Sequence, residues 1–207
     1  MISVLSELEQ DALQEVLNLG MGQAASALAQ LVNEEVHFTV PRLEFLPWHA
    51  VAERLAPDPM ASLIGVRQRF IGPFHGSTLL VYPLEKSLQL VCALLGEEMD
   101  LKGSGAVERD TLTEVGNILL NACLGSLANL MEIEILCDLP EFLEGPWEAF
   151  LAGERHTEGG HETILLLYVE FFTRGNTVQG YVVLLFDAWA VSHLQRELAD
   201  VLHRYEG

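Results

Sequence analysis

The sequence predicts an internally duplicated α/β protein with a mixed, largely antiparallel sheet and two long surface helices. Two internal matches carry this prediction. Residues 11–18 (DALQEVLN) return as residues 110–117 (DTLTEVGN), and the pattern of residues 74–82 returns in residues 178–186. The two offsets, 99 and 104, differ by five residues, which indicates a short insertion in the second copy. We therefore expect two repeats, related by a pseudo-twofold axis, that share the element order α-β-β-β-α.

The repeats are expected to form a single domain over residues 1–207. They divide at about residues 1–103 and 104–207, and the joint near residues 102–106 is too short for a domain linker. The insertion in the second copy falls most simply in the Gly- and Glu-rich stretch 144–162. Because both halves supply amphipathic elements and no long linker separates them, we expect one shared core.

A long helix opens each repeat. Apolar residues recur at helical spacing over residues 13–31 in the first repeat and over residues 112–130 in the second. Ser6, followed three residues later by Glu9, predicts a capping box at the start of the first helix. Small residues in both helices permit the close approach of another backbone, and the glycines within residues 20–22 permit a break or kink.

Three strands and a closing helix follow each long helix. The strands are expected at residues 35–40, 62–71 and 76–82 in the first repeat, and at residues 132–136, 163–173 and 179–186 in the second. We expect Pro41 to end the first of these strands, and the corresponding strand of the second repeat to lie before Pro140. Hairpin turns are expected at residues 72–73 and 174–177, and closing helices at residues 85–95 and 187–204.

The charge is strongly acidic for so apolar a chain. Lys and Arg number 11 against 30 Asp and Glu, a formal charge of −19, while 50% of the residues are hydrophobic. Such a chain can bury a core, and its charge disfavours binding to nucleic acid and to anionic membranes. No apolar run approaches the roughly 20 residues that span a bilayer, and the N-terminus does not resemble a signal peptide. We therefore expect a cytoplasmic protein with neither nucleic-acid nor membrane partners.

The cysteines and histidines do not form a metal motif. Cys92, Cys123 and Cys137 lie among apolar neighbours and in no close pair, so we expect three buried small hydrophobes without disulfides. His156 and His161 share a Gly-rich loop, but two His at uncontrolled loop spacing are a weak metal signal. We expect no metal site in this chain.

One face of each long helix repeats the same three polar residue types. At 100° per residue, positions i, i+4 and i+7 lie within about 40–60° of one another, away from the apolar stripe. These residues are Asp11, Glu15 and Asn18 in the first helix and Asp110, Glu114 and Asn117 in the second. A solvated helix face would explain one copy. However, the polar residues between them differ, as Gln14 and Thr113 do, and an exposed mid-helix Asn has poor helix propensity. We therefore interpret the repeated set as functional.

The repeated motif resembles that of the CheC/CheX/FliY family of bacterial chemotaxis phosphatases. The features that carry the resemblance are the spacing Asp/Ser-x3-Glu-x2-Asn and a proline after 22 further residues, at Pro41 and Pro140. The sequences flanking each Asn, residues 18–26 and 114–125, also resemble that family. The resemblance covers nearly the whole chain, including the repeat. The duplicated motif with matching proline spacing makes it specific.

The resemblance implies a phosphatase that acts on the aspartyl-phosphate of CheY, the chemotaxis response regulator. By that resemblance, Glu15 and Glu114 pair with the active-site Lys of the regulator, while Asn18 and Asn117 orient the attacking water. These residue types suit the chemistry, because phosphoryl transfer needs an in-line water and charge stabilisation rather than covalent catalysis. The Mg²⁺ belongs to the regulator, so the resemblance implies no cofactor of the chain's own. It also suggests CheD as a further partner.

Some alternatives remain open from the sequence. Asp11 and Asp110 are interpreted either as supporting and docking residues or as acids that favour a helix N-terminus. The second repeat has Asn121 where the first has Gly22, so the two sites need not be equally active. The alternative function is a non-catalytic adaptor of the same fold that binds CheD or flagellar switch components. A pure scaffold would not need the Glu/Asn pair.

Overall fold

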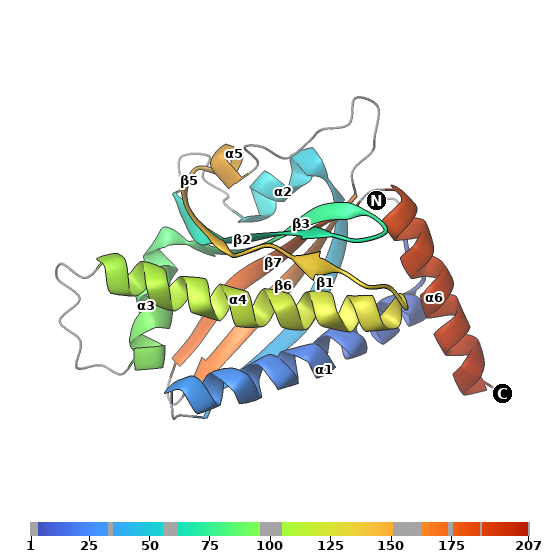
Figure 1. The fold of residues 1–207 in the computed structure, drawn as a ribbon, viewed down its shortest axis with the longest axis horizontal. Helices are drawn as coiled ribbons and strands as arrows, with labels where there is room; N and C mark the ends of the chain where they lie inside the picture. Colours follow the sequence, from blue (N-terminus) through green and yellow to red (C-terminus); the bar gives the residue numbers. More distant parts are fainter. Residues whose placement is uncertain are drawn as a thin grey trace.

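Seven strands form one sheet in the computed structural model of the chain (Figure 1). The structure describes residues 4–32, 35–55, 62–95, 105–150, 163–173, 176–186 and 188–206. The strands are β1 (His37–Pro47), β2 (Leu63–Ile71), β3 (His75–Pro83), β4 (Leu136–Cys137), β5 (Glu141–Gly145), β6 (Thr163–Thr173) and β7 (Asn176–Phe186). Their order is β1-β6-β7-β3-β2-β4, with β5 also paired to β2. All pairings between these described strands are antiparallel.

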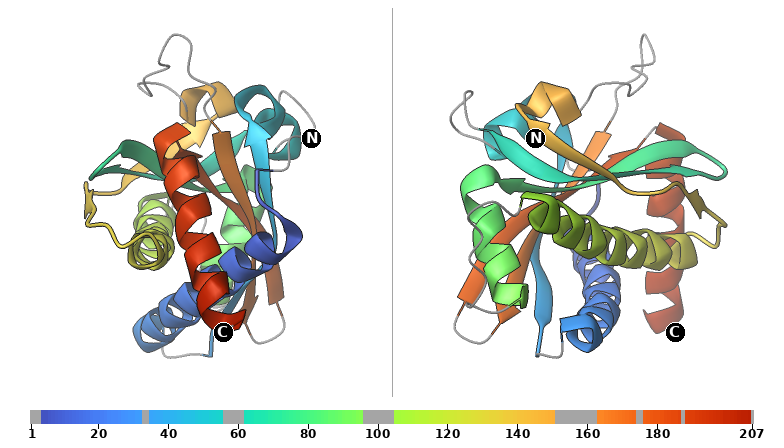
Figure 2. Two further views of the ribbon diagram at one scale, coloured as in Figure 1. Left: turned by 90° about the vertical axis from the view of Figure 1, so that its right-hand side faces the viewer. Right: turned by 60° about the vertical axis from the view of Figure 1, so that its left-hand side comes forward.

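Helices cover both faces of this sheet. They are α1 (Glu7–Val32), α2 (Trp48–Leu55), α3 (Leu84–Leu95), α4 (Gly105–Leu130), α5 (Trp147–Phe150) and α6 (Ala188–Glu206). A large core joins one face to α1, α3, α4 and α6, and a smaller core joins the opposite face to α2 and α5. Figures 1 and 2 show α1 and α4 packed side by side on the first face, running in opposite directions. The predicted α/β class with a largely antiparallel sheet is confirmed.

The sheet order is consistent with a duplicated chain. Strands β1, β2 and β3 of the first half correspond to β5, β6 and β7 of the second. From one edge the order is β1-β6-β7-β3-β2-β5, and from the other edge it is β5-β2-β3-β7-β6-β1, which is the same order with the two halves exchanged. The first long strand of each half pairs with the hairpin of the other half: β1 with β6, and β5 with β2. Residues of both halves therefore contribute to the large core, as expected for two repeats that fold together.

The start of α1 and its crossing with α4 follow from the local sequence. The predicted capping box is present, since Ser6 N–H donates to Glu9 Oε2 at 2.7 Å and Glu9 N–H donates to Ser6 Oγ at 3.3 Å. α1 is unbroken through Gly20 and Gly22, so the break that these glycines permit does not occur. A Cβ at Gly20 would lie 2.1 Å from Ser126 Oγ, so this glycine lets α4 approach closely.

The first strand does not end at Pro41, so that prediction is wrong. β1 continues to Pro47, and its register against β6 shifts between Thr39 and Arg42. The shift places Val40 and Pro41 in a bulge. A proline is tolerated there because its missing N–H removes no hydrogen bond from the ladder.

The prediction of a strand over residues 132–136 is also wrong. The chain leaves α4 through a left-handed cap, in which Glu132 has a φ of 51° and Ile133 N–H donates to Ala128 O at 3.0 Å. The left-handed conformation of Glu132 and the hydrogen bond of Ile133 N–H are not compatible with strand pairing at these two residues. Only the short β4 pairs before Pro140, and the longer β5 begins after it.

The sequence prediction missed α2 and α5. Both helices lie on the face of the sheet opposite the long helices, where Val51 and Leu55 of α2 and Trp147 and Phe150 of α5 join the smaller core. They are too short for a helical period to stand out in the sequence. Each half therefore has the element order α-β-α-β-β-α. In the second half, two short strands, β4 and then β5, stand in the place of the single first strand.

The cysteines only partly follow their prediction. Cys123 is buried, and burial raises the pKa of its thiol to about 12. Cys137 is exposed, so its predicted burial is wrong; it lies on β4 at the end of the sheet order. Partial burial of the Cys137 thiol still raises its pKa, and the neighbouring Asp138 carboxylate adds to the shift. Among the helices in the described residues, none is long and apolar enough to cross a membrane.

Candidate functional site

The structure places the two repeated residue sets on two separate helices. Site one is formed by Asp11, Glu15 and Asn18 on α1, and site two by Asp110, Glu114 and Asn117 on α4. In both sites the two acids are exposed and the Asn is half-buried. Site one lies beside β1 and site two is linked to β2, so the sites face opposite ends of the sheet order.

At site one, the backbone of β1 holds the Asn18 side chain. Val40 N–H donates to Asn18 Oδ1 at 2.8 Å, and Asn18 Nδ2 donates to Val40 O at 3.4 Å. The bulge makes both groups available, because Val40 has no partner in the β1–β6 register. Gln14 Nε2 adds a hydrogen bond to Pro41 O at 3.3 Å. The proline of the motif thus lies beside its Asn, in the bulge that orients it.

At site two, a second amide takes the place of the strand backbone. Asn121 Nδ2 donates to both Asn117 Oδ1 and Asn117 O, each at 2.8 Å. Asn121 Oδ1 accepts from Gln68 Nε2 at 3.4 Å, and Gln68 Nε2 also donates to Asp138 O at 3.1 Å. A chain of side-chain amides therefore links Asn117 to the interior of the sheet.

The two sites differ because the chain after each long helix differs. The counterpart of Val40 in the second repeat is Leu139, which lies in an irregular segment and is 89% exposed. It has no bulged strand from which to hold Asn117. Comparison of the two repeats within the sequence identified the change from Gly22 to Asn121, but it did not point to Gln68. No sequence signal places a buried strand residue of one repeat beneath the helix of the other.

The acids of site two line a pocket whose other wall is apolar. Asp110 and Glu114 share this pocket with Leu28 and Leu31 at the end of α1 and with Leu94 of α3. A long cationic side chain that enters it would meet the carboxylates at its head and apolar groups along its stem. The pocket therefore favours a Lys or Arg from a partner.

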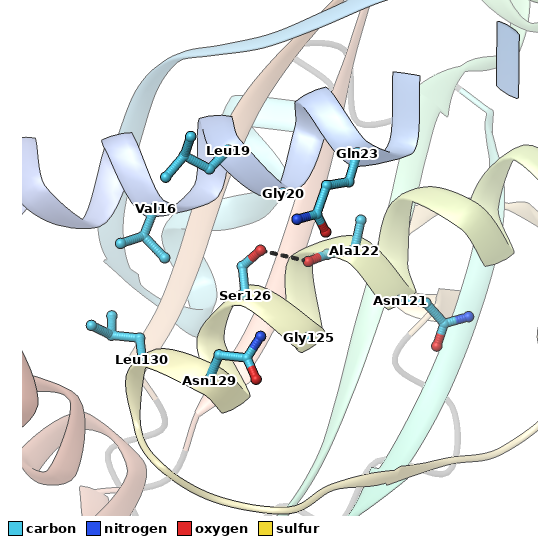
Figure 3. Close-up of a pocket in the computed structure, with 10 residues that line it drawn as sticks. All are labelled: Val16, Leu19, Gly20, Gln23, Asn121, Ala122, Gly125, Ser126, Asn129 and Leu130. Carbon is cyan, nitrogen blue, oxygen red and sulfur yellow. Dashed lines mark hydrogen bonds between the residues drawn. The ribbon is translucent and has the colours of Figure 1, made fainter. Parts of the chain in front are cut away.

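A groove also runs between α1 and α4 (Figure 3). It is lined by Val16, Leu19, Gly20 and Gln23 of α1 and by Asn121, Ala122, Gly125, Ser126, Asn129 and Leu130 of α4. Ser126 Oγ donates to Ala122 O at 2.9 Å, so this hydroxyl is used within its own helix. Figure 3 shows the Asn121 amide directed away from this crossing. Asn121 thus lies at the end of the groove, with its amide turned toward site two.

Metal ligands are not grouped in the described part of the chain. Within those residues, no three His, Cys, Asp or Glu side chains come together in a way that could hold a metal ion. His156 and His161 lie outside the described residues.

Comparison with known proteins decides the family. Residues 8–44 match the CheC-like family, and this segment contains all of site one together with the bulge at Val40 and Pro41. The chain is 31% identical over 142 residues to the CheY-P phosphatase CheC of Bacillus subtilis, and the alignment covers 66% of each protein. The chain belongs to the CheC-like family. This CheC-like chain is also 28% identical over 135 residues to the flagellar motor switch phosphatase FliY of B. subtilis. That alignment covers 63% of the chain and 34% of FliY.

Solved structures share the fold of this CheC-like chain. FliY of Thermotoga maritima superposes with a TM-score of 0.72 at 20% identity, over 97% of this chain and 99% of that one. The FliM middle domain of H. pylori has a TM-score of 0.60 at 12% identity, over 93% and 99% of the two chains. CheX of Desulfovibrio desulfuricans has a TM-score of 0.52 at 14% identity, over 83% and 99%. At these identities the likeness establishes the fold alone.

Proposed function

We propose that this CheC-like chain is a phosphatase that hydrolyses the aspartyl-phosphate of a CheY-type response regulator and so ends a chemotaxis signal. One observation carries the proposal: each long helix presents an exposed Glu one turn before an Asn whose amide is already held by hydrogen bonds. Two B. subtilis relatives, a CheY-P phosphatase and a flagellar motor switch phosphatase, support it by their names.

The role proposed for each Asn is to orient the attacking water. A carbonyl oxygen has two lone pairs, and Asn18 Oδ1 uses one of them to accept from Val40 N–H. Asn117 Oδ1 likewise accepts one hydrogen bond from Asn121. Each oxygen can therefore accept a second one, from water. Because the protein already holds the amide, placing the water in line with the P–O bond costs little further entropy.

The role proposed for each Glu is to bind the active-site Lys of the regulator. Glu15 and Glu114 are exposed, and a charge-assisted hydrogen bond to an ammonium group would set the distance between the two proteins. Asp11 and Asp110 extend the acidic face by one turn and would aid docking. The regulator supplies the Mg²⁺ in this mechanism, so the chain itself needs no cofactor.

Phosphate release from a purified, phosphorylated CheY-type regulator tests the proposal. Substoichiometric amounts of the chain should accelerate release at least about tenfold over the regulator alone, which corresponds to lowering the barrier by about 1.4 kcal/mol. If the chain binds the phosphorylated regulator without changing its decay, the phosphatase proposal is wrong and the adaptor alternative is supported. If binding is also absent, the partner class itself is wrong.

Exposed leucines beside site two offer the regulator an apolar contact. Leu136 and Leu139 are 77% and 89% exposed, and the Gln68–Asp138 hydrogen bond keeps this segment next to Asn121. Large apolar side chains gathered at the rim of a polar site are typical of a protein interface. We propose that the docked regulator covers them.

Leu139→Asp should weaken docking at site two without changing the chemistry. In an Asn18→Ala background, where site two acts alone, we expect KM for the phosphorylated regulator to rise about tenfold and kcat to stay within about twofold. Leu88→Asp is the matched control, because Leu88 is also exposed but lies on α3. An unchanged KM for Leu139→Asp, or an equal rise for both variants, would contradict this docking surface.

A further inference from the structure

We propose that Gln68 and Asn121 are positioning residues for site two, which together hold the Asn117 amide in its working orientation. The inference rests on the proposed function, because it assigns a role to the amide of that site. Neither residue belongs to the three-residue set that recurs on the two helices. The hydrogen bond between them connects β2 of the first half of the chain to α4, and Asn121 bonds in turn to Asn117 within α4.

An Asn side chain depends on its neighbours for its orientation. Rotation about χ2 exchanges the oxygen and the nitrogen of the amide at low cost, so hydrogen-bond partners decide which atom faces the ligand. At site one, Val40 supplies both partners, its N–H for Oδ1 and its carbonyl for Nδ2 of Asn18. At site two, the corresponding segment around Leu139 is irregular. There Asn121, which is itself bonded to Gln68, holds the Oδ1 of Asn117 alone.

The orientation at site two is set by a chain of amides that begins at a backbone carbonyl. Asp138 O can only accept, so the Gln68 atom 3.1 Å away is the nitrogen. The same nitrogen lies 3.4 Å from Asn121 Oδ1, and the backbone Asn117 O accepts from Asn121 Nδ2 at 2.8 Å. Both partners turn the Asn121 oxygen to Gln68 and its nitrogen to Asn117. Asn117 consequently turns its oxygen to Asn121. Its Nδ2 has no hydrogen-bond partner among the described residues and is left for a ligand.

Because Gln68 is buried, it can influence the Asn117 amide of site two only through Asn121. Gln68 is 2% exposed, so a docked regulator cannot touch it. Its Oε1 is also buried, and within the described residues this oxygen has no hydrogen-bond partner. A buried acceptor without a partner is destabilising, so the Gln68 Oε1 costs stability. The Gln68 Nε2 holds both the Asp138 carbonyl and the Asn121 amide, and we assign the Gln at this position to orienting the amides of site two.

Kinetics in an Asn18→Ala background test the proposal, because only site two then contributes to hydrolysis. Gln68→Leu preserves the shape of the side chain and removes both its hydrogen bonds and its orphan oxygen. We expect kcat to fall about tenfold and the unfolding midpoint to stay within about 2 °C or to rise. KM should rise as well, because the hydrogen bond from Gln68 to Asp138 that holds the exposed Leu136 and Leu139 is also lost. Asn121→Ala should lower kcat by a similar factor. Asn129→Ala, at another exposed Asn of α4, is the matched control and should leave kcat unchanged.

Side-chain ¹⁵N relaxation of Asn117 provides a readout that does not depend on activity. The Asn117 amide should be ordered in the parent and in Asn129→Ala, and mobile in Gln68→Leu and Asn121→Ala. An amide that stays ordered in Gln68→Leu overturns the proposal. So does a loss of kcat in Asn121→Ala without one in Gln68→Leu, because Asn121 would then act by itself.

Failure of the proposed function would look different from failure of this inference. The parent chain would then not accelerate phosphate release at all, whatever the mobility of Asn117. If the parent is active but the Asn18→Ala background is inactive, the inference is overturned, because site two would hold no working amide.

Discussion

Replacing Asn18 and Asn117 together with Ala should lower the acceleration of aspartyl-phosphate hydrolysis about 100-fold, toward the rate of the regulator alone. The attacking water then loses the group that places it in line. KM should change little, because Glu15 and Glu114 still bind the regulator. Each single variant should keep the activity of the other site, since the two amides belong to separate hydrogen-bond networks. Phosphate release, measured over a range of regulator concentrations, separates kcat from KM.

The two single variants should differ in stability. Asn18→Ala leaves Val40 N–H without its 2.8 Å acceptor, which should cost about 1 kcal/mol and lower the melting temperature by about 2–4 °C. Asn117→Ala removes a partner only from the exposed Asn121, so its cost should stay within about 0.5 kcal/mol. Thermal melts therefore separate lost catalysis from lost folding. A folded double variant that hydrolyses like the parent would contradict the mechanism.

Gly180→Ala should destabilise the fold by about 2–3 kcal/mol, which corresponds to a fall of about 5–10 °C in the melting temperature. Gly180 lies on β7 beside Tyr82 of β3, and a Cβ there would be 2.1 Å from Tyr82 Cε1. The ring cannot move aside easily, because it is 2% exposed within the large core. Urea or thermal unfolding of the purified variant measures the effect.

Two further variants show whether the Tyr82 ring is the cause. In Gly180→Ala combined with Tyr82→Leu, the clash is removed, so the double variant should lose less stability than the sum of the two single changes. Gly125→Ala is the matched control: a Cβ at Gly125 of α4 meets nothing within 4 Å, so this change should stabilise the helix by about 0.5–1 kcal/mol. If Gly180→Ala and Gly125→Ala have the same effect, the close approach of Tyr82 does not constrain β7.

Elements with a strong periodic pattern were predicted well from the sequence. The strand expected at residues 163–173 is β6 with those bounds, and the helix expected at residues 85–95 is α3 with one residue more. The capping box of Ser6 and Glu9 is also present. These features depend on neighbours in the chain, so the local sequence contains the physical information that specifies them.

The first strands of the two repeats were predicted badly because interactions outside each strand decide its course. Pro41 locally favours the end of a strand, but β1 continues through it because β1 pairs with β6, more than a hundred residues away. The proline lies in a bulge of that pairing. The strand expected at residues 132–136 is lost to the cap formed by Glu132 and Ile133. In both cases, interactions outside the strand decided which backbone groups were available for a ladder.

The sequence by itself predicted the fold class, the two long helices and the face on which each Glu and Asn lies, because these follow from periodicity along one chain segment. The tertiary structure decided how each Asn is held. Site one uses a bulged strand backbone at Val40, and site two uses the amides of Gln68 and Asn121. A side-chain amide takes its orientation from the donors and acceptors around it, and only folding brings those partners together.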